Sequence, residues 1–303
     1  MKEFYLSLDL GGTKTKAAIF SKGGELIEDS VLLEPSVTFE GEERVYSQTK
    51  LVIDKVLDRS GFDRSGLLGI GVGAPGPLNT KTGVIIHSPM MGWRNFPIAQ
   101  RLFEDFKTKV LLENDANLGA LAEQRRGVAK GLASVGYMTV STGIGGGIVL
   151  DGRIYHGKND GAAEFGHISI SPNGFECPCG NRGCLELYAS GTALAQIAAT
   201  RGLPTDIKQL VKKAEFGMYD AINLFREAGR NLGLGITTIL NILDLELLVL
   251  GGGMTKARRW FEEEMLRTIE QSTIQQFSRD RIAFSKMSDH VVLYGAYYLI
   301  SNQ

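Results

Sequence analysis

The sequence FYLSLDLGGTKTKAAIF, residues 4–20, predicts two strands joined by a tight turn. The apolar segments 4–10 and 15–20 are expected to be the strands. Between them, Gly11 and Gly12 permit positive φ angles and carry no side chains, so backbone N–H groups can approach an anion. An ordinary hairpin turn also favours glycine, and this simpler interpretation stays open.

Residues beside this turn supply the other groups that a phosphate site needs. Thr13 provides a hydroxyl donor and Lys14 a positive charge. Asp9, at the end of the first strand, can hold a metal-bound water. We therefore treat residues 9–14 as a candidate phosphate loop.

Outward from this hairpin, strands and helices alternate, and the order β-β-β-α-β-α-β appears twice. The pattern predicts an α/β protein in which mixed sheets are flanked by helices. The further strands are expected at residues 26–33, 67–72, 110–112, 134–140, 147–150, 153–155 and 247–250. Helices are expected at residues 44–59, 96–106, 116–126, 187–200, 205–215, 221–240, 256–271 and 291–300.

The two copies of this pattern predict two α/β domains. Residues 1–115 with residues 291–303 are expected to form the small domain, because the apolar helix 291–300 can return to it. Residues 116–290 are expected to form the large domain. A length of 303 residues suits two domains.

Composition narrows the classes of function. The net charge is −1, which argues against a nucleic-acid surface held by basic residues. No run approaches 18 apolar residues, and the first residues lack the features of a signal peptide. We therefore expect a cytoplasmic enzyme with no membrane or nucleic-acid partner, whose cysteines are reduced.

Two more glycine-rich turns are candidate phosphate sites. The first, STGIGGG at residues 141–147, lies between two predicted strands and includes Thr142 and Gly143. It contains more glycine than a hairpin turn requires, although the hairpin interpretation remains possible. The second is Gly251, Gly252 and Gly253, between a strand and a helix, where free helix N–H groups favour an anion.

All three cysteines lie in one short segment with a histidine. Three thiols and one imidazole make a complete tetrahedral set for Zn²⁺, and a loop rich in Gly, Pro and Asn can bring them together. The alternative is three unrelated cysteines beside a core histidine. Two carboxylates flank the set and remain free for other work. The residues are Glu164, His167, Cys177, Cys179, Cys184 and Glu186.

A further polar centre is the sequence ENDAN, residues 113–117, before a predicted helix. Asn and Asp are preferred helix caps, which would explain Asn114 and Asp115 without any function. In the functional interpretation, the helix N-terminus stabilises the ionised form of Asp115, which then acts as a weak base. Together with Glu164 and Glu186, these groups suit a ligand with several hydroxyls.

These motifs resemble those of the ROK family (repressors, open reading frames, kinases). The likeness covers nearly the whole chain. It rests on the phosphate loop at residues 9–14, APGP at 74–77, GWRN at 92–95, ENDAN at 113–117, the glycine turn at 141–147, and the motif ExGH followed by CxCGxxGCxE at 164–186. The resemblance implies an actin-like ATPase or sugar-kinase fold, with ATP and sugar in the cleft between its two domains and a small zinc-binding insertion.

The resemblance also implies roles for residues of this chain. The activity would be that of a glucokinase of carbohydrate metabolism, with Asp115 as the catalytic base and ATP and Mg²⁺ as cofactors. The sugar would be held by Asn114, Asp115, Glu164, His167 and Glu186. The ATP site would include Asp9, Gly11, Gly12, Thr13, Lys14, Thr142, Gly143, Gly251, Gly252 and Gly253. A structural Zn²⁺ would be held by His167, Cys177, Cys179 and Cys184.

The resemblance leaves the substrate and the assembly open. Where glucokinase-like members have Asn near the sugar, this chain has Met90, which cannot hydrogen-bond hydroxyls as Asn does. N-acetylmannosamine, N-acetylglucosamine and fructose are therefore alternative substrates. A sugar-sensing repressor is a weaker alternative, because the phosphate loop begins within ten residues of Met1 and leaves no room before it for a DNA-binding domain. The family implies a homodimer or homotetramer.

Overall fold

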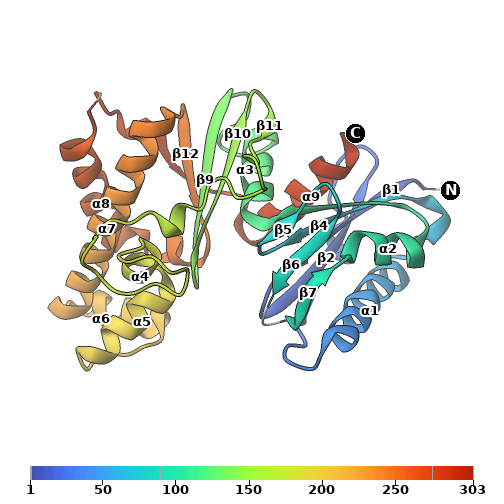
Figure 1. The fold of residues 1–303 in the computed structure, drawn as a ribbon, viewed down its shortest axis with the longest axis horizontal. Coiled ribbons are helices and arrows are strands. Elements are labelled where there is room, and N and C mark those ends of the chain that lie inside the picture. The colour runs from blue at the N-terminus through green and yellow to red at the C-terminus, as the bar shows by residue number, and fades with distance from the viewer. Residues whose placement is uncertain (1, 89–90, 275, 303) are drawn as a thin grey trace. The chain divides into compact units, whose positions relative to one another are not determined.

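A computed structural model describes residues 2–88, 91–274 and 276–302. The chain divides into two compact units, each built on a β-sheet (Figure 1). The first unit comprises Met1–Arg126, Arg153–Ala162 and Asp289–Gln303, and the second comprises Gly127–Gly152 and Ala163–Ser288.

The sheet of the first unit has the strand order β3-β2-β1-β4-β8. Strand β1 pairs antiparallel with β2 and parallel with β4, and β4 pairs parallel with β8. Strands β1 and β4 are buried along most of their length, as expected for strands covered on both faces. The strand bounds are β1 Phe4–Leu10, β2 Lys14–Ser21, β3 Leu32–Pro35, β4 Leu67–Ala74 and β8 Lys109–Asn114.

Helices contact this sheet and one another, and glycines of β4 determine how closely one of them packs. The last helix, α9 (Val291–Ser301), contacts β1 and β4. A Cβ at Gly71 would collide with the carbonyl oxygen of Ala296 on α9. The side chains of Ile70 and Val72, which alternate with the glycines, instead belong to the core that α1 (Glu42–Ser60) and α2 (Ile98–Phe106) share.

The second unit repeats this topology. Its strands β9 (Ser134–Val140) and β10 (Ile144–Leu150) pair antiparallel, and β12 (Leu247–Gly251) lies parallel to β9. Strand β13 (Ile282–Phe284), which the sequence analysis missed, pairs parallel with β12. The order β10-β9-β12-β13 therefore matches β2-β1-β4-β8 in position and direction, which confirms the predicted duplication.

Helices of the second unit enclose the largest apolar core, with α7 and α8 side by side (Figure 1). A Cβ at Gly229 of α7 would collide with the carbonyl oxygen of Phe261 on α8, so this glycine lets the two helices approach closely. The helix bounds are α4 Glu186–Ala189, α5 Gly191–Thr200, α6 Ile207–Glu215, α7 Tyr219–Leu243 and α8 Arg258–Ser272.

Several predicted elements are wrong in detail. The strand predicted at residues 26–33 is interrupted by a 3-10 turn, Glu28–Ser30, because the buried Ser30 hydroxyl accepts from Ile19 N–H and donates to the carbonyl of Ile27. The helix predicted at residues 187–200 is two helices, since Ser190 caps α5 by accepting from Ala193 N–H. The helix predicted from residue 256 begins as a 3-10 turn, Gly253–Ala257.

A small antiparallel sheet in the first unit was also not predicted. It contains β5 (Leu78–Asn79), β6 (Val84–Ser88) and β7 (Trp93–Phe96). Strand β7 takes the first residue of the helix predicted at 96–106, because Trp93 and Phe96 stack with their ring centroids 4.5 Å apart in the core. Pro89 and Met90, on which the substrate question depends, lie outside the described residues.

The compact units differ from the predicted domains in three places, one of which is that residues 289–290 belong to the first unit. Helix α3 (Asp115–Arg125) belongs to the first unit, where it packs against α9. Residues 153–162, which include β11 (Arg153–Ile154), also belong there, and β11 contacts α3. Among the described residues, no helix combines the length and the apolar character needed to cross a membrane.

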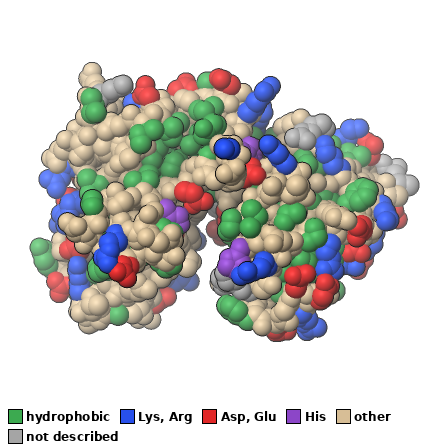
Figure 2. Space-filling view, viewed as in Figure 1, with side chains coloured by type: hydrophobic (Ala, Val, Ile, Leu, Met, Phe, Trp, Pro, Cys, Tyr) green, Lys and Arg blue, Asp and Glu red, His purple; other side chains and the backbone are tan. Residues whose placement is uncertain are grey.

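Charged side chains are spread over the surface. On the face shown in Figure 2, acidic and basic side chains are interspersed, with no extended basic field. This distribution agrees with the net charge of −1.

Candidate functional site

Strand β8 delivers Asn114 and Asp115 to the N-terminus of α3. Asn114 is the N-cap, and its Oδ1 accepts from the N–H groups of Ala116 at 2.9 Å and Asn117 at 3.3 Å. The half-buried Asp115 accepts from Ala116 N–H at 2.8 Å through its Oδ1. The capping interpretation of this motif is therefore confirmed for Asn114.

Asp9 and Asp115 form a pair of acidic groups within the first unit. Burial, and then the charge of Asp115, raise the pKa of Asp9 to about 7, while Lys16 acts in the opposite direction. A carboxylate whose pKa is raised by burial and by a neighbouring carboxylate attracts a cation, since a positive charge relieves both desolvation and repulsion. The donor set is oxygen, which suits Mg²⁺.

The first glycine turn, beside Asp9, is a closed hairpin. Gly11 N–H donates to the carbonyl of Lys14 at 3.0 Å, so this N–H is engaged inside the turn. The Ser36 hydroxyl donates to the carbonyl of Gly11 at 2.7 Å, and Ser36 N–H donates to the carbonyl of Thr13 at 2.9 Å. The hairpin interpretation is thus correct for the backbone of Gly11. Ser36, the residue that follows β3, stabilises the turn through these two hydrogen bonds.

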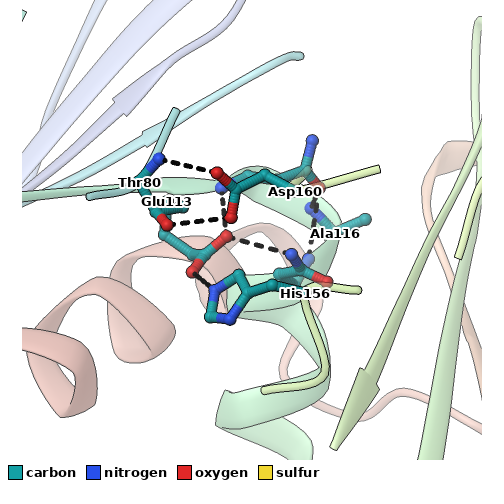
Figure 3. Close-up of polar contacts among 7 residues, drawn as sticks. Thr80, Glu113, Ala116, His156 and Asp160 are labelled. Carbon is teal, nitrogen blue, oxygen red and sulfur yellow. Dashed lines mark hydrogen bonds and ion pairs between the residues drawn. The ribbon is translucent and has the colours of Figure 1, made fainter. Parts of the chain in front are cut away.

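A hydrogen-bond network that the sequence analysis missed lies beneath the N-terminus of α3 (Figure 3). The buried Glu113 accepts from Asn114 N–H at 2.8 Å and from Asn117 Nδ2 at 2.9 Å through Oε1. Its Oε2 lies 2.6 Å from His156 Nε2. Four residues further along the chain, Asp160 accepts from the N–H of Thr80 at 3.1 Å and from its hydroxyl at 2.9 Å.

In the second unit, the predicted metal ligands come together. One ligand atom from each of His167, Cys177, Cys179 and Cys184 lies within 4.8 Å of all the others. Cys177 Sγ is 3.8 Å from His167 Nδ1, and Cys179 Sγ is 3.6 Å from Cys184 Sγ. Sulfur ligands about 2.3 Å from a tetrahedral zinc are about 3.8 Å apart, so the spacing and the donor types fit Zn²⁺.

The Cys184 thiol of this cluster disfavours ionisation without a cation. Burial, followed by the neighbouring Cys177 and Cys179, raises the pKa of Cys184 to about 12. A metal ion reverses this preference, because it binds the thiolate directly. The chemistry of the four donors therefore fits a bound metal better than three free thiols.

His167 links the metal cluster to Glu164, because its two ring nitrogens face different partners. His167 turns Nδ1 toward Cys177, while its Nε2 lies 4.0 Å from Glu164 Oε2. Glu164 occupies an inverse γ-turn with φ −69° and ψ 58°, closed by Phe165 N–H donating to the carbonyl of Ala163 at 2.6 Å. The imidazole can thus bind a metal in the cluster through Nδ1 and a ligand beside Glu164 through Nε2.

Glu186, the second flanking carboxylate, is tied to the second glycine turn. Its Oε2 accepts from Ile144 N–H at 2.7 Å. A Cβ at Gly143 would lie 2.5 Å from the same oxygen, so glycine is needed there for the carboxylate to approach. Helix α5 holds the turn from the other side, since Gly191 N–H donates to the carbonyl of Ser141 at 2.7 Å.

The second and third glycine turns meet at one pocket. Gly252 has φ +87°, and a Cβ there would collide with the carbonyl of Val140, which brings the third turn against the second. The pocket has a volume of about 700 Å³, within the range of small-molecule sites. Its lining includes Ser141, Thr142, Gly253, Met254 and Lys256, together with Ile207, Lys208, Val211 and Lys212 of α6.

The predicted site residues therefore fall into two groups. The first unit holds Asp9, the first glycine turn, Asn114 and Asp115. The second unit holds the metal cluster, Glu164, Glu186 and the other two glycine turns. The contribution of α6 to the pocket was missed, because its sequence carries an ordinary amphipathic helix pattern.

The fold and these motifs define a class of protein. A family model described as the ROK family matches residues 5–303, and the chain belongs to this family. Among solved structures, a ROK hexokinase from Thermus thermophilus is 34% identical, with a TM-score of 0.85 and complete coverage of both chains. A ROK family glucokinase from Streptomyces griseus, in complex with glucose and AMPPNP, is 26% identical with a TM-score of 0.83, covering 99% of this chain and 100% of that one.

Curated relatives include both enzymes and regulators. A glucokinase from Halalkalibacterium halodurans is 35% identical over 298 residues, covering 92% of this chain and 88% of its own length. A putative xylose repressor from Caldicellulosiruptor is 27% identical, covering 97% of this chain and 77% of its own length. The fold is accordingly the mixed α/β fold of ROK sugar kinases, with two units that each contain a sheet.

Proposed function

We propose that the protein is an ATP-dependent hexose kinase that transfers the γ-phosphoryl group of ATP to the 6-hydroxyl of glucose. The observation that carries the proposal is the hydrogen bond from Ile144 N–H to Glu186. It ties a carboxylate suited to a sugar to the glycine turn that lines a nucleotide-sized pocket. The names of the Halalkalibacterium and Streptomyces relatives point to the same substrate.

The pocket of the second unit is proposed to bind the nucleotide. Thr142 and the third glycine turn offer backbone and hydroxyl donors for phosphates, and Lys208, Lys212 and Lys256 add positive charge to the lining. Ile207, Val211 and Met254 provide apolar surface for the base. In the first unit, residues 9–14 are proposed to contact the transferred phosphate, with Mg²⁺ near Asp9.

The sugar is proposed to be held by Asn114, Glu164, His167 and Glu186. The Asp115 carboxylate accepts the proton of the 6-hydroxyl while the O6 atom of the sugar attacks the γ-phosphorus. The new P–O bond forms as the bond to the β,γ-bridging oxygen breaks, and ADP leaves. Mg²⁺ would neutralise charge on the phosphates.

The Cys/His cluster is proposed to hold a structural Zn²⁺. Four protein ligands leave no open position, so the metal would not take part in the chemistry. Its role would be to fix His167 and, through the γ-turn, Glu164. Sugar recognition would therefore depend on the metal, although phosphoryl transfer would not involve it directly.

The proposal is tested by measuring ADP release with ATP-Mg²⁺ and a panel of glucose, fructose, N-acetylglucosamine and N-acetylmannosamine. Glucose is expected to give the highest kcat/KM, and ³¹P and ¹³C NMR should place the phosphate on O6. A higher kcat/KM for another sugar would replace glucose but keep the kinase. If no sugar stimulates ADP release while sugar still binds, the protein would be a regulator like its repressor relatives.

We further propose that the protein acts in the cytoplasm as a homodimer or homotetramer. Sedimentation equilibrium of the purified protein, with and without glucose, checks the state of assembly.

A further inference from the structure

The pair His156 and Glu113 has no role in the proposed function above, although Glu113 is the first residue of the ENDAN motif. Glu113 directly precedes Asn114, the N-cap of α3, and the Glu113 side chain is 2% exposed. His156 reaches it from the segment 153–162, with His156 Nε2 2.6 Å from Glu113 Oε2 and a side chain 34% exposed (Figure 3). A buried carboxylate needs partners, and this imidazole occupies one of its two oxygens.

The other oxygen of Glu113 fixes the backbone and a side chain of the catalytic turn. Oε1 accepts from Asn114 N–H and from Asn117 Nδ2. Asn114 in turn caps α3, and Asp115 is the next residue. The direction of the Glu113 carboxylate therefore determines the position of the N-terminal turn that carries Asp115.

We propose that His156 is a positioning residue for phosphoryl transfer: by binding Glu113, it holds the turn on which Asp115 accepts the proton of the sugar hydroxyl. This role rests on the proposed function. Without the imidazole, Glu113 has one unpaired buried oxygen and can turn toward water, which would release Asn114 N–H and Asn117. A displacement of about 1 Å at a reacting group can lower turnover about a hundredfold.

A competing explanation is that the contact between His156 and Glu113 only anchors the segment 153–162 to the rest of the first unit. A second contact anchors the same segment, in which Asp160 accepts two hydrogen bonds from Thr80. Thr80 does not contact Glu113 in any bond described for the first unit. The contacts His156–Glu113 and Thr80–Asp160 can therefore be removed one at a time and their effects compared.

The test uses four variants of the full-length protein, assayed with ATP-Mg²⁺ and the best sugar. His156→Leu keeps the volume of the side chain but removes the donor, whereas His156→Gln keeps an N–H donor at a similar reach. Thr80→Val removes the hydroxyl that donates to Asp160. Glu113→Gln retains an acceptor for Asn114 N–H without the charge, and it is also combined with His156→Leu.

We expect His156→Leu to lower kcat about ten- to hundredfold, with KM for ATP within about twofold of wild type. His156→Gln should recover kcat to within about fivefold of wild type, and Thr80→Val should change it less than about twofold. In the Glu113→Gln background, His156→Leu should add less than about threefold, because the two residues act as one unit.

A wild-type kcat in His156→Leu would overturn the role, as would an equal loss in Thr80→Val or fully multiplied losses in the double variant. NMR of the histidine Cε1–H groups checks the contact itself. The hydrogen bond to Glu113 is the main cause that raises the pKa of His156; Asp160 adds to it, and burial and Lys81 oppose it. That pKa should fall in Glu113→Gln and remain raised in Thr80→Val; an unchanged value in Glu113→Gln would disprove the contact.

These outcomes separate the role of His156 from the proposed function. If the wild-type protein phosphorylates no sugar of the panel, the proposed function fails and the positioning role of His156 fails with it. If the wild type is active and His156→Leu equals it, the positioning role alone fails. Circular dichroism and the melting temperature of each variant identify any loss of folding.

Discussion

The N-terminus of α3 in the first unit and the Cys/His cluster in the second are polar sites of opposite kinds. At α3, the Glu113 carboxylate already has protein partners on both oxygens, from Asn114, Asn117 and His156. In the cluster, three thiols and an imidazole converge with sulfur atoms as close as 3.6 Å. The first site is preorganised by hydrogen bonds, while the second offers a set of donors that fits a metal ion.

The largest effect should come from breaking the first site at its proposed base. Asp115→Asn keeps the size of the side chain but removes the proton acceptor, and we expect kcat to fall about a thousandfold. Calorimetric titration with a non-hydrolysable ATP analogue should give a Kd within about threefold of wild type. A variant that keeps a tenth of the activity would show that Asp115 is not the base.

Removing the metal should break the second site. Elemental analysis should find about one zinc per chain, and extraction with a chelator or Cys184→Ser should lower the melting temperature by roughly 10 °C or more. Restoring zinc to the extracted wild type should recover both stability and sugar binding, whereas Cys184→Ser should not recover. A metal-free protein that is fully stable and active would contradict the structural role.

Asp9 provides a further test of the first unit, because its pKa is raised. Burial and the neighbouring Asp115 raise this pKa more than Lys16 lowers it. Its pKa is about 7 in the folded protein, against 3.8 for an unperturbed aspartate, so ionisation costs stability as the pH rises from about 4 to about 7. Without Mg²⁺, Asp9→Asn should therefore be more stable than wild type above pH 7, by at most about 4 kcal/mol, and equal to it near pH 4. Urea unfolding across this pH range measures the difference.

The matched control for this prediction is the exposed Asp58, whose change to Asn should leave the pH dependence of wild type unaltered. Mg²⁺ with ADP should reduce the advantage of Asp9→Asn, since a bound cation favours the ionised aspartate. An Asp9→Asn variant that loses stability with rising pH as steeply as wild type would contradict the shifted pKa.

The smallest effect concerns the backbone beside the metal cluster. Ala163 has φ +62°, a conformation that costs an alanine about 1–2 kcal/mol, partly offset by the greater freedom of glycine in the unfolded chain. Ala163→Gly should therefore stabilise the protein by about 0.5–1 kcal/mol, with kcat unchanged. Ala162→Gly, at a residue without positive φ, should instead destabilise it by a similar amount. Calorimetry of the two variants distinguishes these signs.

The sequence predicted features that depend on local or rare signals. Strand β1 and the following hairpin were correct because apolar runs and paired glycines act within a few residues. The convergence of Cys177, Cys179 and Cys184 with His167 was predictable because few arrangements of clustered thiols suit a reducing environment. The duplicated sheet order followed from the alternation of elements.

Features that depend on distant contacts were missed. Glu113 and His156 lie 43 positions apart, and no spacing rule joins a glutamate to a histidine of a distant segment. The interruption of the predicted strand 26–33 depends on Ser30 bonding to Ile19 of another strand. The pocket wall from α6 likewise arises from packing, since Ile207 and Val211 follow the pattern of any amphipathic helix.

The contact between α9 and β4 has a consequence for how the chain is made. Helix α9 follows the whole second unit in sequence, yet it packs on the glycine face of β4, a strand synthesised more than 200 residues earlier. On the ribosome, β1 and β4 would emerge with one face of their sheet uncovered. The two segments of the second unit, Gly127–Gly152 and Ala163–Ser288, both precede α9, so that unit would already have all its parts. The unit that begins first would thus be the last to be completed.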